Sequence, residues 1–367
     1  MIPVCEPLIK KQELRYVTEC LKTGWISSNG RFINEFEEKW AKYCGMNYGI
    51  AVSNGTVALE VALGCLDLEP GDEIIMPVFT IISCALAAIY NEAKPVFVDS
   101  EPRTYTIDTT KIEEKITRNT RVIMPVHIYG HPCDMDPIYK IAKKYNLIII
   151  EDAAEAHGAE YKGKKCGSLG DISCFSFYSN KIITTGEGGM LLTNDKNYAE
   201  KARSIRNLYF QKERRFYHKE LGNNFRLTNI QAAIGLAQLE RISEHIEKKI
   251  WIGKNYNERL KNIPGLILPI EKAWAKNVYW MYGVVLDENI RIDAKELASR
   301  LNKLGVDTRP FFLGMHEQPI LKKMGLVKDE SYPVSEMISR RGLYFPSGLT
   351  LTEKDISFVV DAVKKAL

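Results

Sequence analysis

An aspartate and a lysine near the middle of the chain each follow an apolar run. Asp152 stands two residues after the run 147–150 (Leu-Ile-Ile-Ile), and Lys181 follows the mostly apolar segment 173–178. Four branched apolar residues in succession are typical of a strand buried on both faces, and open α/β sheets bind ligands at the carboxyl ends of such strands. We therefore expect both side chains to face one site.

This pair of groups suits the chemistry of pyridoxal phosphate (PLP), which needs an amine to condense with the cofactor aldehyde and a carboxylate beside the pyridine nitrogen. Asp152 would keep that nitrogen protonated, so that the ring can accept electrons when a carbon–hydrogen bond breaks. Lys181 would hold the cofactor and, once displaced by an incoming amine, carry a proton between carbon atoms. Taken singly, a lysine is more often a surface residue and an aspartate more often a helix cap, so the prediction rests on their joint placement.

Several longer stretches resemble one known family. They are VSNGTVAL (52–59), VHIYGHPCDMD (126–136), EDAAEAHGA (151–159), GSLGDISCFSFYSNKIITTGEGG (167–189) and RLTNIQAAIGLAQLER (226–241). Together they resemble the DegT/DnrJ/EryC1/StrS aminotransferases, and the likeness extends from residue 2 nearly to the C-terminus. Within that family, the segments IPVCEP, GWISSNG, TRPFFLGMHEQP and LYFPSGLTLTEKDI are most similar to the GDP-perosamine synthases.

The resemblance implies a fold-type I, aspartate aminotransferase-like α/β protein. A large PLP-binding domain with a mostly parallel sheet is expected over residues 1–245, and a smaller C-terminal α+β domain over 246–367. The implied reaction moves an amino group from L-glutamate to a nucleotide-linked 4-keto-6-deoxy sugar, with GDP-4-keto-6-deoxymannose as the preferred substrate and GDP-perosamine as the product.

The alternation of strand and helix patterns independently predicts a mostly parallel sheet with helices on both faces. We expect strands at 48–52, 74–76, 94–99, 122–126, 147–150, 173–178, 190–193 and 279–285, and helices at 10–23, 32–44, 57–65, 110–116, 137–145, 229–242 with a continuation to 260, 294–304 and 353–365. No G-x-G-x-x-G follows the first strand, which argues against a dinucleotide-binding fold.

A phosphate site is expected where the strand 48–52 meets the next helix. The unpaired backbone amides of a helix N-terminus attract anions, and Gly55 allows close approach, so Gly55 and Thr56 are the candidates to hold the PLP phosphate. By itself this turn could equally be an ordinary helix cap. By resemblance, Ser176 also contacts the phosphate and Glu155 contacts the ring hydroxyl.

The residue that packs on the face of the PLP ring is left open. The family's aromatic position falls on Ile81, so an aliphatic side chain packs there, or Phe79 or His157 supplies the ring from elsewhere.

By resemblance, the loop with Trp25, Ser28 and Asn29 helps to close over the sugar, although Trp25 could instead be a core residue between two helices. His316 lies where the resemblance suggests a sugar contact, but a lone histidine is more often structural.

The segment 200–220 is dense in charge, and its cations include Arg203, Arg206, Lys212, Arg214 and Arg215. Most of these are expected on a solvated surface, but some could meet nucleotide phosphates, which the planar guanidinium group suits. By resemblance, Asn224 and Arg226 are cofactor-binding residues that reach into the active site of a second subunit, which implies a homodimer with shared sites.

Composition limits the remaining classes. The chain has 367 residues, of which 45% are hydrophobic and 26% charged, and its net charge of +4 gives no reason to expect a nucleic acid or an anionic membrane as partner. The eight cysteines include no C-x-x-C pair, so we expect free thiols and assign no metal ligands. The first residues lack the pattern of a signal peptide, and the apolar segment 74–90 is interrupted at Pro77, so a cytoplasmic enzyme is expected.

Three alternatives stay open. A UDP- or TDP-linked sugar could replace the GDP sugar. The same fold also serves PLP-dependent sugar dehydratases, but the resemblance implies that these carry histidine in place of Lys181. A non-catalytic member of the fold would be expected to lack the intact set of Asp152, Ser176 and Lys181.

Overall fold

The centre of the molecule is a seven-stranded sheet, seen in a computed structural model that describes residues 1–211 and 213–367; the predicted cation Lys212 lies outside the described residues. The strands follow one another across the sheet as β1 (Tyr48–Val52), β9 (Gly189–Thr193), β8 (Ile172–Ser176), β5 (Ile148–Asp152), β4 (Thr120–Ile123), β2 (Glu73–Pro77) and β3 (Lys94–Val98). All pairings from β8 to β3 are parallel, whereas β9 is antiparallel to both of its neighbours. The predicted α/β fold with a mostly parallel sheet is confirmed.

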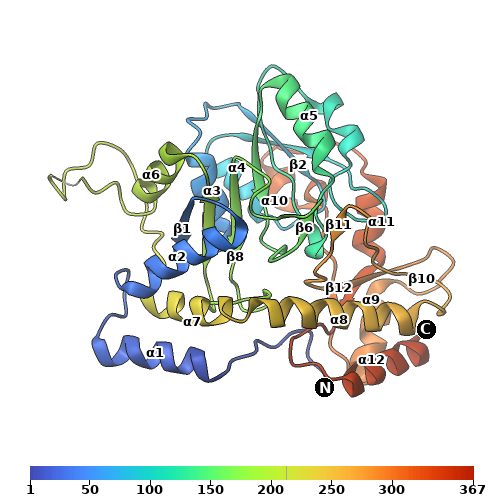
Figure 1. Cartoon of the computed structure of the whole chain (residues 1–367). Coiled ribbons are helices and arrows are strands. Elements are labelled where there is room, and N and C mark those ends of the chain that lie inside the picture. Colours follow the sequence, from blue (N-terminus) through green and yellow to red (C-terminus); the bar gives the residue numbers. More distant parts are fainter. Residues whose placement is uncertain (212) are drawn as a thin grey trace.

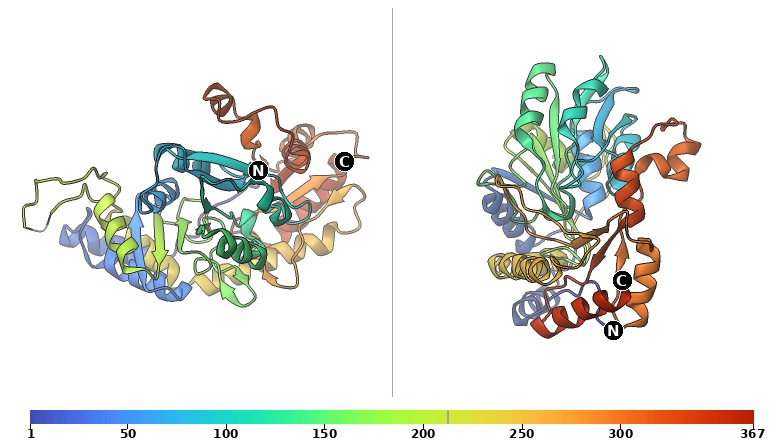
Figure 2. Two further views of the ribbon diagram at one scale, coloured as in Figure 1. Left: turned by 90° about the horizontal axis from the view of Figure 1, so that it is seen from above. Right: turned by 90° about the vertical axis from the view of Figure 1, so that its right-hand side faces the viewer.

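Helices cover both sides of this sheet (Figures 1 and 2). Helix α3 (Gly55–Gly64) packs on β8 and β9 and against α4 (Ser83–Tyr90) and α6 (Lys196–Ile205). Helix α2 (Arg31–Cys44) packs between β1 and α7 (Asn229–Leu239), and α1 (Lys11–Thr23) lies on α7. Helix α5 (Met135–Tyr145) precedes β5. Because β5 is buried, its apolar run carries Asp152 directly to the edge where the strands end.

Helix α8 (Ile242–Leu260) carries the chain away from the central sheet, almost in line with α7 (Figure 1). It leads to an antiparallel sheet of β10 (Leu266–Ile267), β12 (Tyr282–Leu286), β14 (Gly342–Phe345) and β13 (Arg309–Pro310), with α9 (Ala294–Lys303), α10 (Pro319–Lys323), α11 (Pro333–Arg341) and α12 (Glu353–Ala366). A second buried apolar cluster fills this part and begins at Ile252. The predicted domain boundary at 245/246 falls inside α8 and stays a prediction.

Some local predictions were wrong. The expected helix at 110–116 is two single turns of 3₁₀ helix, η1 (Thr109–Lys111) and η2 (Glu113–Lys115), because the Asp108 side chain accepts the N–H of Thr110 and favours a turn. The expected strand 122–126 ends at Ile123, shortly before Pro125, which has no N–H to donate. The helix expected to run without a break from 229 to 260 is divided at Glu240 and Arg241.

A small sheet of β11 (Ala275–Lys276), β6 (Glu160–Tyr161) and β7 (Lys164–Lys165) was not predicted. It joins the chain beyond α8 to the loop after β5. Among the residues that the structure describes, no helix has both the length and the apolar character needed to cross a membrane.

The loop after β4 interlocks with residues 278–280. Tyr129 and Gly130, in η3 (Ile128–Gly130), both have positive φ, at 53° and 97°. The Gly130 carbonyl accepts the N–H of Val278 at 3.2 Å, and a Cβ at Gly130 would lie 2.8 Å from the backbone nitrogen of Trp280. Glycine is therefore needed here both for its backbone conformation and for the close approach of a second chain segment.

Gly130→Ala is expected to destabilise the protein more than Gly71→Ala. Gly71 has nearly the same φ, 94°, but no heavy atom lies within 4 Å of its would-be Cβ. Backbone strain alone should cost about 1–2 kcal/mol at Gly71, and overpacking should add about 1–3 kcal/mol at Gly130. Chemical denaturation of both variants measures the difference, and equal losses would show that the contact with residues 278–280 is unimportant.

Candidate functional site

A cavity of about 670 Å³ opens at the carboxyl ends of β5 and β8. Its wall includes six of the predicted site residues: Gly55, Thr56, Asp152, Glu155, Ser176 and Lys181. Side chains from the C-terminal part close the same cavity, namely Trp280, Phe312 and Tyr344. The parallel sheet thus brings together residues that are more than 120 positions apart in the chain.

The Asp152 side chain is fixed by two donors. The N–H of Ala154 donates to Oδ1 at 3.0 Å, and the Cys84 thiol donates to Oδ2 at 3.2 Å. Burial raises the pKa of Asp152, and these two donors together with Lys181 oppose the shift. A protonated pyridine nitrogen beside the carboxyl group would favour its ionised form further.

Lys181 lies in a turn directly after β8, where its N–H donates to the Tyr178 carbonyl at 2.9 Å. Its side chain is 10% exposed, and Nζ lies 3.7 Å from Glu155 Oε1 and 3.8 Å from the centroid of the Trp280 ring. Burial lowers the pKa of Lys181, and the carboxylates of Glu155 and Asp152 oppose that shift. A lowered pKa increases the share of neutral amine, which is the form that attacks carbonyl groups and accepts protons.

The N-terminus of α3 supplies the expected anion site. The Asn54 side chain accepts the N–H of Val57 at 2.9 Å, whereas the N–H groups of Gly55 and Thr56 have no partner among the described residues. Ser176 lies so close that a Cβ on Gly55 would be 2.7 Å from the Ser176 Cβ. Two free amides at the positive end of a helix, with hydroxyl groups beside them, suit a phosphate.

Of the three candidates for stacking on the cofactor ring, only Ile81 lines the cavity. Phe79 is fully buried among Tyr129, Phe311 and Phe312, and His157 is buried among Trp40, Phe175 and Phe177. Both side chains belong to the hydrophobic core.

The remaining predicted residues lie elsewhere. Ser28, Asn29 and Arg226 line a second cavity of about 380 Å³, together with Arg203, Arg206 and Arg215. Among the described residues, no acidic side chain lines it, although Arg206 pairs with Glu37 nearby. This second cavity is a strongly basic site, separate from the Lys181 cavity within one chain.

Trp25 is 56% exposed, which excludes its alternative role as a core residue. Asn224 is exposed on the loop that precedes Arg226. The arm formed by residues 206–211 and 213–224 projects from the body beyond α6 (Figures 1 and 2).

His316 does not line the Lys181 cavity. It is 7% exposed in η4 (Met315–Glu317), with its ring against Tyr332 and Nε2 3.4 Å from Glu336 Oε1. This placement suits the structural alternative for a lone histidine, and it offers no support for the predicted sugar contact.

Sequence reasoning missed Trp280, Cys84 and Tyr129. Trp280 follows Lys181 by 99 positions and lies in the apolar run 278–282, where nothing distinguishes it from a core residue. Cys84 is one of eight scattered cysteines. The positive φ of Tyr129 is unusual for an aromatic residue, and only the adjacent Gly130 hinted at a special backbone.

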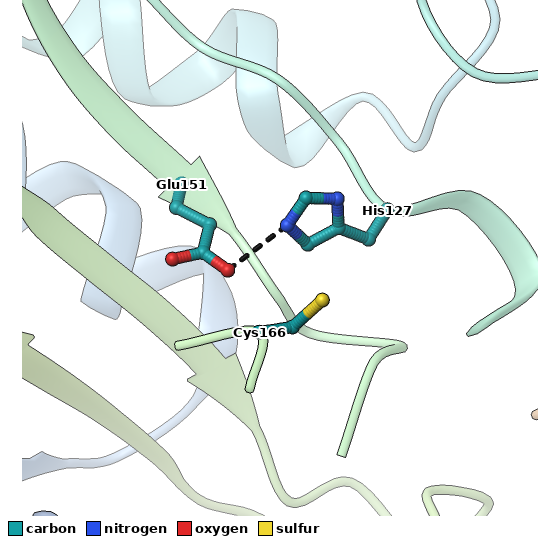
Figure 3. Close-up of side chains that lie close together, drawn as sticks. All are labelled: His127, Glu151 and Cys166. Atoms are coloured by element: carbon teal, nitrogen blue, oxygen red, sulfur yellow. Dashed lines mark hydrogen bonds and ion pairs between the residues drawn. The ribbon is translucent and has the colours of Figure 1, made fainter. Parts of the chain in front are cut away.

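His127, Glu151 and Cys166 form a buried cluster around the Glu151 side chain of β5 (Figure 3). The His127 and Glu151 side chains are already hydrogen-bonded: His127 Nε2 lies 2.9 Å from Glu151 Oε1, and His127 Nδ1 accepts the N–H of Cys133 at 3.0 Å. Glu151 also accepts from the N–H groups of Gly167 and Leu169 and from the Ser173 hydroxyl, at 2.5–2.8 Å. We interpret the cluster as a hydrogen-bond network that joins the carboxyl end of β5 to β8 and the adjacent loops, because few lone pairs are left for a metal ion.

Comparison with known proteins agrees with this site. The sequence profile of the DegT/DnrJ/EryC1/StrS aminotransferase family matches residues 7–364. The chain belongs to this family. It is 45% identical to the GDP-perosamine synthase of Caulobacter vibrioides over 367 residues, with 100% of this chain and 98% of the relative covered. It is 41% identical to the GDP-perosamine synthase of Escherichia coli O157:H7, with 99% and 98% covered.

Solved structures give the same result. The aminotransferase of Psychrobacter cryohalolentis superposes with a TM-score of 0.91 at 31% identity, and the match covers 98% of this chain and 97% of that one. Members of the family are PLP-dependent sugar aminotransferases, so PLP is the cofactor of this DegT-family enzyme. The residues present fit PLP: free amides at α3 for the phosphate, a buried carboxyl group and a lysine across one cavity.

Gly55→Ala is expected to weaken PLP binding, because the added methyl group would push Ser176 and the N-terminus of α3 apart. Overpacking of about 1–3 kcal/mol at this contact corresponds to roughly a 5- to 150-fold rise in the dissociation constant. Equilibrium dialysis of PLP against the cofactor-free protein measures it. The matched control is Gly64→Ala at the other end of α3, where the neighbours of the added Cβ lie 3.3–3.4 Å away. Unchanged PLP affinity in Gly55→Ala would contradict the assigned phosphate site.

Proposed function

We propose that this aminotransferase converts a nucleotide-linked 4-keto-6-deoxy sugar to the 4-amino sugar, with L-glutamate as amino donor. The preferred substrate is GDP-4-keto-6-deoxymannose and the product GDP-perosamine. The observation that carries the proposal is full-length identity of 41–45% with two proteins named GDP-perosamine synthase, together with an intact lysine, carboxylate and anion site in one cavity.

The chain's own residues divide the work of the reaction. When bound, PLP supplies an electron sink for the carbon that loses its proton. Asp152 would keep the pyridine nitrogen of the cofactor protonated, and Gly55, Thr56 and Ser176 would bind its phosphate. Lys181 takes the α-proton of glutamate and later gives a proton to C4 of the sugar. By resemblance, Glu155 would contact the ring hydroxyl of the cofactor from the same wall.

The nucleotide diphosphate is assigned to the second cavity, on a homodimer. Arg203, Arg215 and Arg226 line that cavity without an acidic partner among its lining residues, and a diphosphate would balance their charge. In the proposed dimer, the partner copy places Arg226 and Asn224 beside the Lys181 cavity, and Trp25, Ser28 and Asn29 close over the sugar.

Two observations weigh against the other functions. The dehydratase alternative requires a histidine in place of Lys181, and the lysine is present. A non-catalytic protein would have no need of a buried lysine and two carboxyl groups in one cavity, where each costs free energy unless it is paired. A UDP- or TDP-linked sugar stays the alternative substrate.

The substrate assignment predicts the outcome of a product assay. PLP-loaded protein and L-glutamate are incubated with matched GDP-, UDP- and TDP-4-keto-6-deoxy sugars, and mass spectrometry identifies the products. Amine is expected chiefly from the GDP sugar. If amine formed only from the UDP or TDP sugar, the assigned nucleotide would change, but the assigned reaction would stay the same. A product that has lost a hydroxyl group, or no amine from any sugar, would overturn the 4-aminotransferase assignment.

Shared sites predict that two inactive variants restore one another. Lys181→Ala and Arg226→Ala homodimers should each have little activity. A heterodimer would contain one site with both residues intact, so equal mixing with subunit exchange should recover about a quarter of wild-type activity. Mixing Lys181→Ala with Ser176→Ala is the control, since both changes lie in the same half-site and no intact site can form. Full activity of Arg226→Ala alone, or no recovery on mixing, would contradict the shared site.

A further inference from the structure

The Lys181 amine is confined between one carboxyl group and one aromatic ring. Glu155 Oε1 lies 3.7 Å from Nζ, and Nζ lies over the Trp280 ring, 3.8 Å from its centroid. The indole N–H of Trp280 donates to the Asn180 carbonyl at 2.8 Å, which fixes the ring against the turn that carries Lys181. The carboxylate therefore lies within ion-pair distance of the amine.

Tyr129 contacts both groups that flank the Lys181 amine, Glu155 and Trp280. Its N–H donates to Glu155 Oε2 at 2.8 Å, and its ring stacks on Trp280 with a centroid separation of 6.3 Å and an interplanar angle of 28°. The left-handed backbone at Tyr129, with φ of 53°, costs free energy and lets the N–H and the ring contact both groups. Such strain at a cavity indicates a built arrangement and not a chance contact.

Other titratable groups around the pair are poorly matched to exchange a proton with it near neutral pH. Burial raises the pKa of the thiols of Cys5 and Cys84 and of the phenol of Tyr129, raises that of Tyr344 to about 12, and lowers that of His157 to about 3. Asp152 keeps one oxygen on Cys84 and the other on Ala154. Lys249 lines a small cavity beside Lys181 together with Glu6, and burial lowers its pKa to about 8, but its Nζ donates to the Ser347 carbonyl.

The pKa values of Glu155 and Lys181 shift toward one another. Burial raises the pKa of Glu155 to about 7, against the opposing effects of the Lys181 cation and the Tyr129 N–H, while burial lowers the pKa of Lys181. The raised pKa of the acid and the lowered pKa of the base narrow the difference between the two groups, which favours exchange of a proton within the pair.

We propose that Glu155 exchanges a proton with Lys181: it accepts one when the lysine must be a neutral amine and returns it when the lysine must be an acid. In this step the Lys181 N–H bond breaks and the Glu155 O–H bond forms, giving a neutral amine and a neutral carboxylic acid. The reverse step restores the ammonium and the carboxylate. Trp280 and Tyr129 are the positioning residues, because they hold the two groups at this separation. The proposal rests on aminotransferase chemistry and not on the identity of the sugar.

The test uses cofactor-free protein, so it does not depend on turnover. Competitive acetylation of Lys181 is measured by mass spectrometry across the pH range, because only the neutral amine reacts. In the wild-type protein the curve should be broader than a single one-proton titration, as expected for a coupled pair. Glu155→Gln keeps an oxygen for the Tyr129 N–H but cannot ionise. Since the neighbouring negative charge is lost, the Lys181 curve should become a single step shifted about 1–3 pH units lower.

Glu60→Gln is the matched control, because it removes a half-buried carboxyl group of α3 that faces no lysine, and its Lys181 curve should match that of the wild type. Infrared spectroscopy of the wild-type protein near pH 6 should show the carbonyl stretch of a buried carboxylic acid that is missing in Glu155→Gln. A Lys181 curve unchanged by Glu155→Gln would overturn the proposal, and so would a wild-type curve that fits one proton with no carboxylic acid band. The wild-type measurements need no variant and keep the test decisive even if Glu155→Gln fails to fold.

Discussion

The structure depends on one buried carboxylate, Glu151. A charge in the core is costly unless it is fully hydrogen-bonded, and Glu151 meets that condition with donors from three separate segments: Gly167 and Leu169, Ser173 on β8, and His127 after β4. Successive residues of a strand point to opposite faces. On one face of the sheet, Glu151 therefore joins the carboxyl end of β5 to the neighbouring segments. Asp152, the next residue, faces the cavity on the other. The buried apolar residues 149–150, which precede Glu151 and Asp152 on β5, fix how far both carboxyl groups lie from the protein surface.

The second constraint is the crossing of the loop 127–130 by residues 278–280. The large sheet alone would leave Lys181 in an open cavity. Because Gly130 lets the later segment approach its backbone, Trp280 reaches the lysine from a part of the chain that belongs mainly to the second core. The water-excluding wall follows from this crossing, and with it the burial that lowers the pKa of Lys181 and raises that of Glu155.

How far the sequence could predict this site follows from the range of the interactions. Strand, turn and helix signals are local, so the positions of Asp152, Lys181 and the α3 anion site could be inferred from short runs, and all three line one cavity. Trp280, Cys84 and Tyr129 act through contacts between distant segments, which leave no periodic mark in the chain. The failed helix at 110–116 has the opposite cause: Asp108 forms a local turn that competes with the helical backbone. The assignment of His316 to the sugar rested on resemblance alone, and its ring instead lies against Tyr332.

The separation of the two cavities has a consequence for specificity. Lys181, Asp152 and Glu155 lie in one cavity, and the arginines suited to a diphosphate lie in another. If the partner copy brings the second cavity over the first, the remote nucleotide can contribute binding energy that orients the keto carbon without any change to the groups that move protons. Side chains of residues 24–30, 206–211 and 213–226 could then alter sugar and nucleotide preference independently of the groups that move protons.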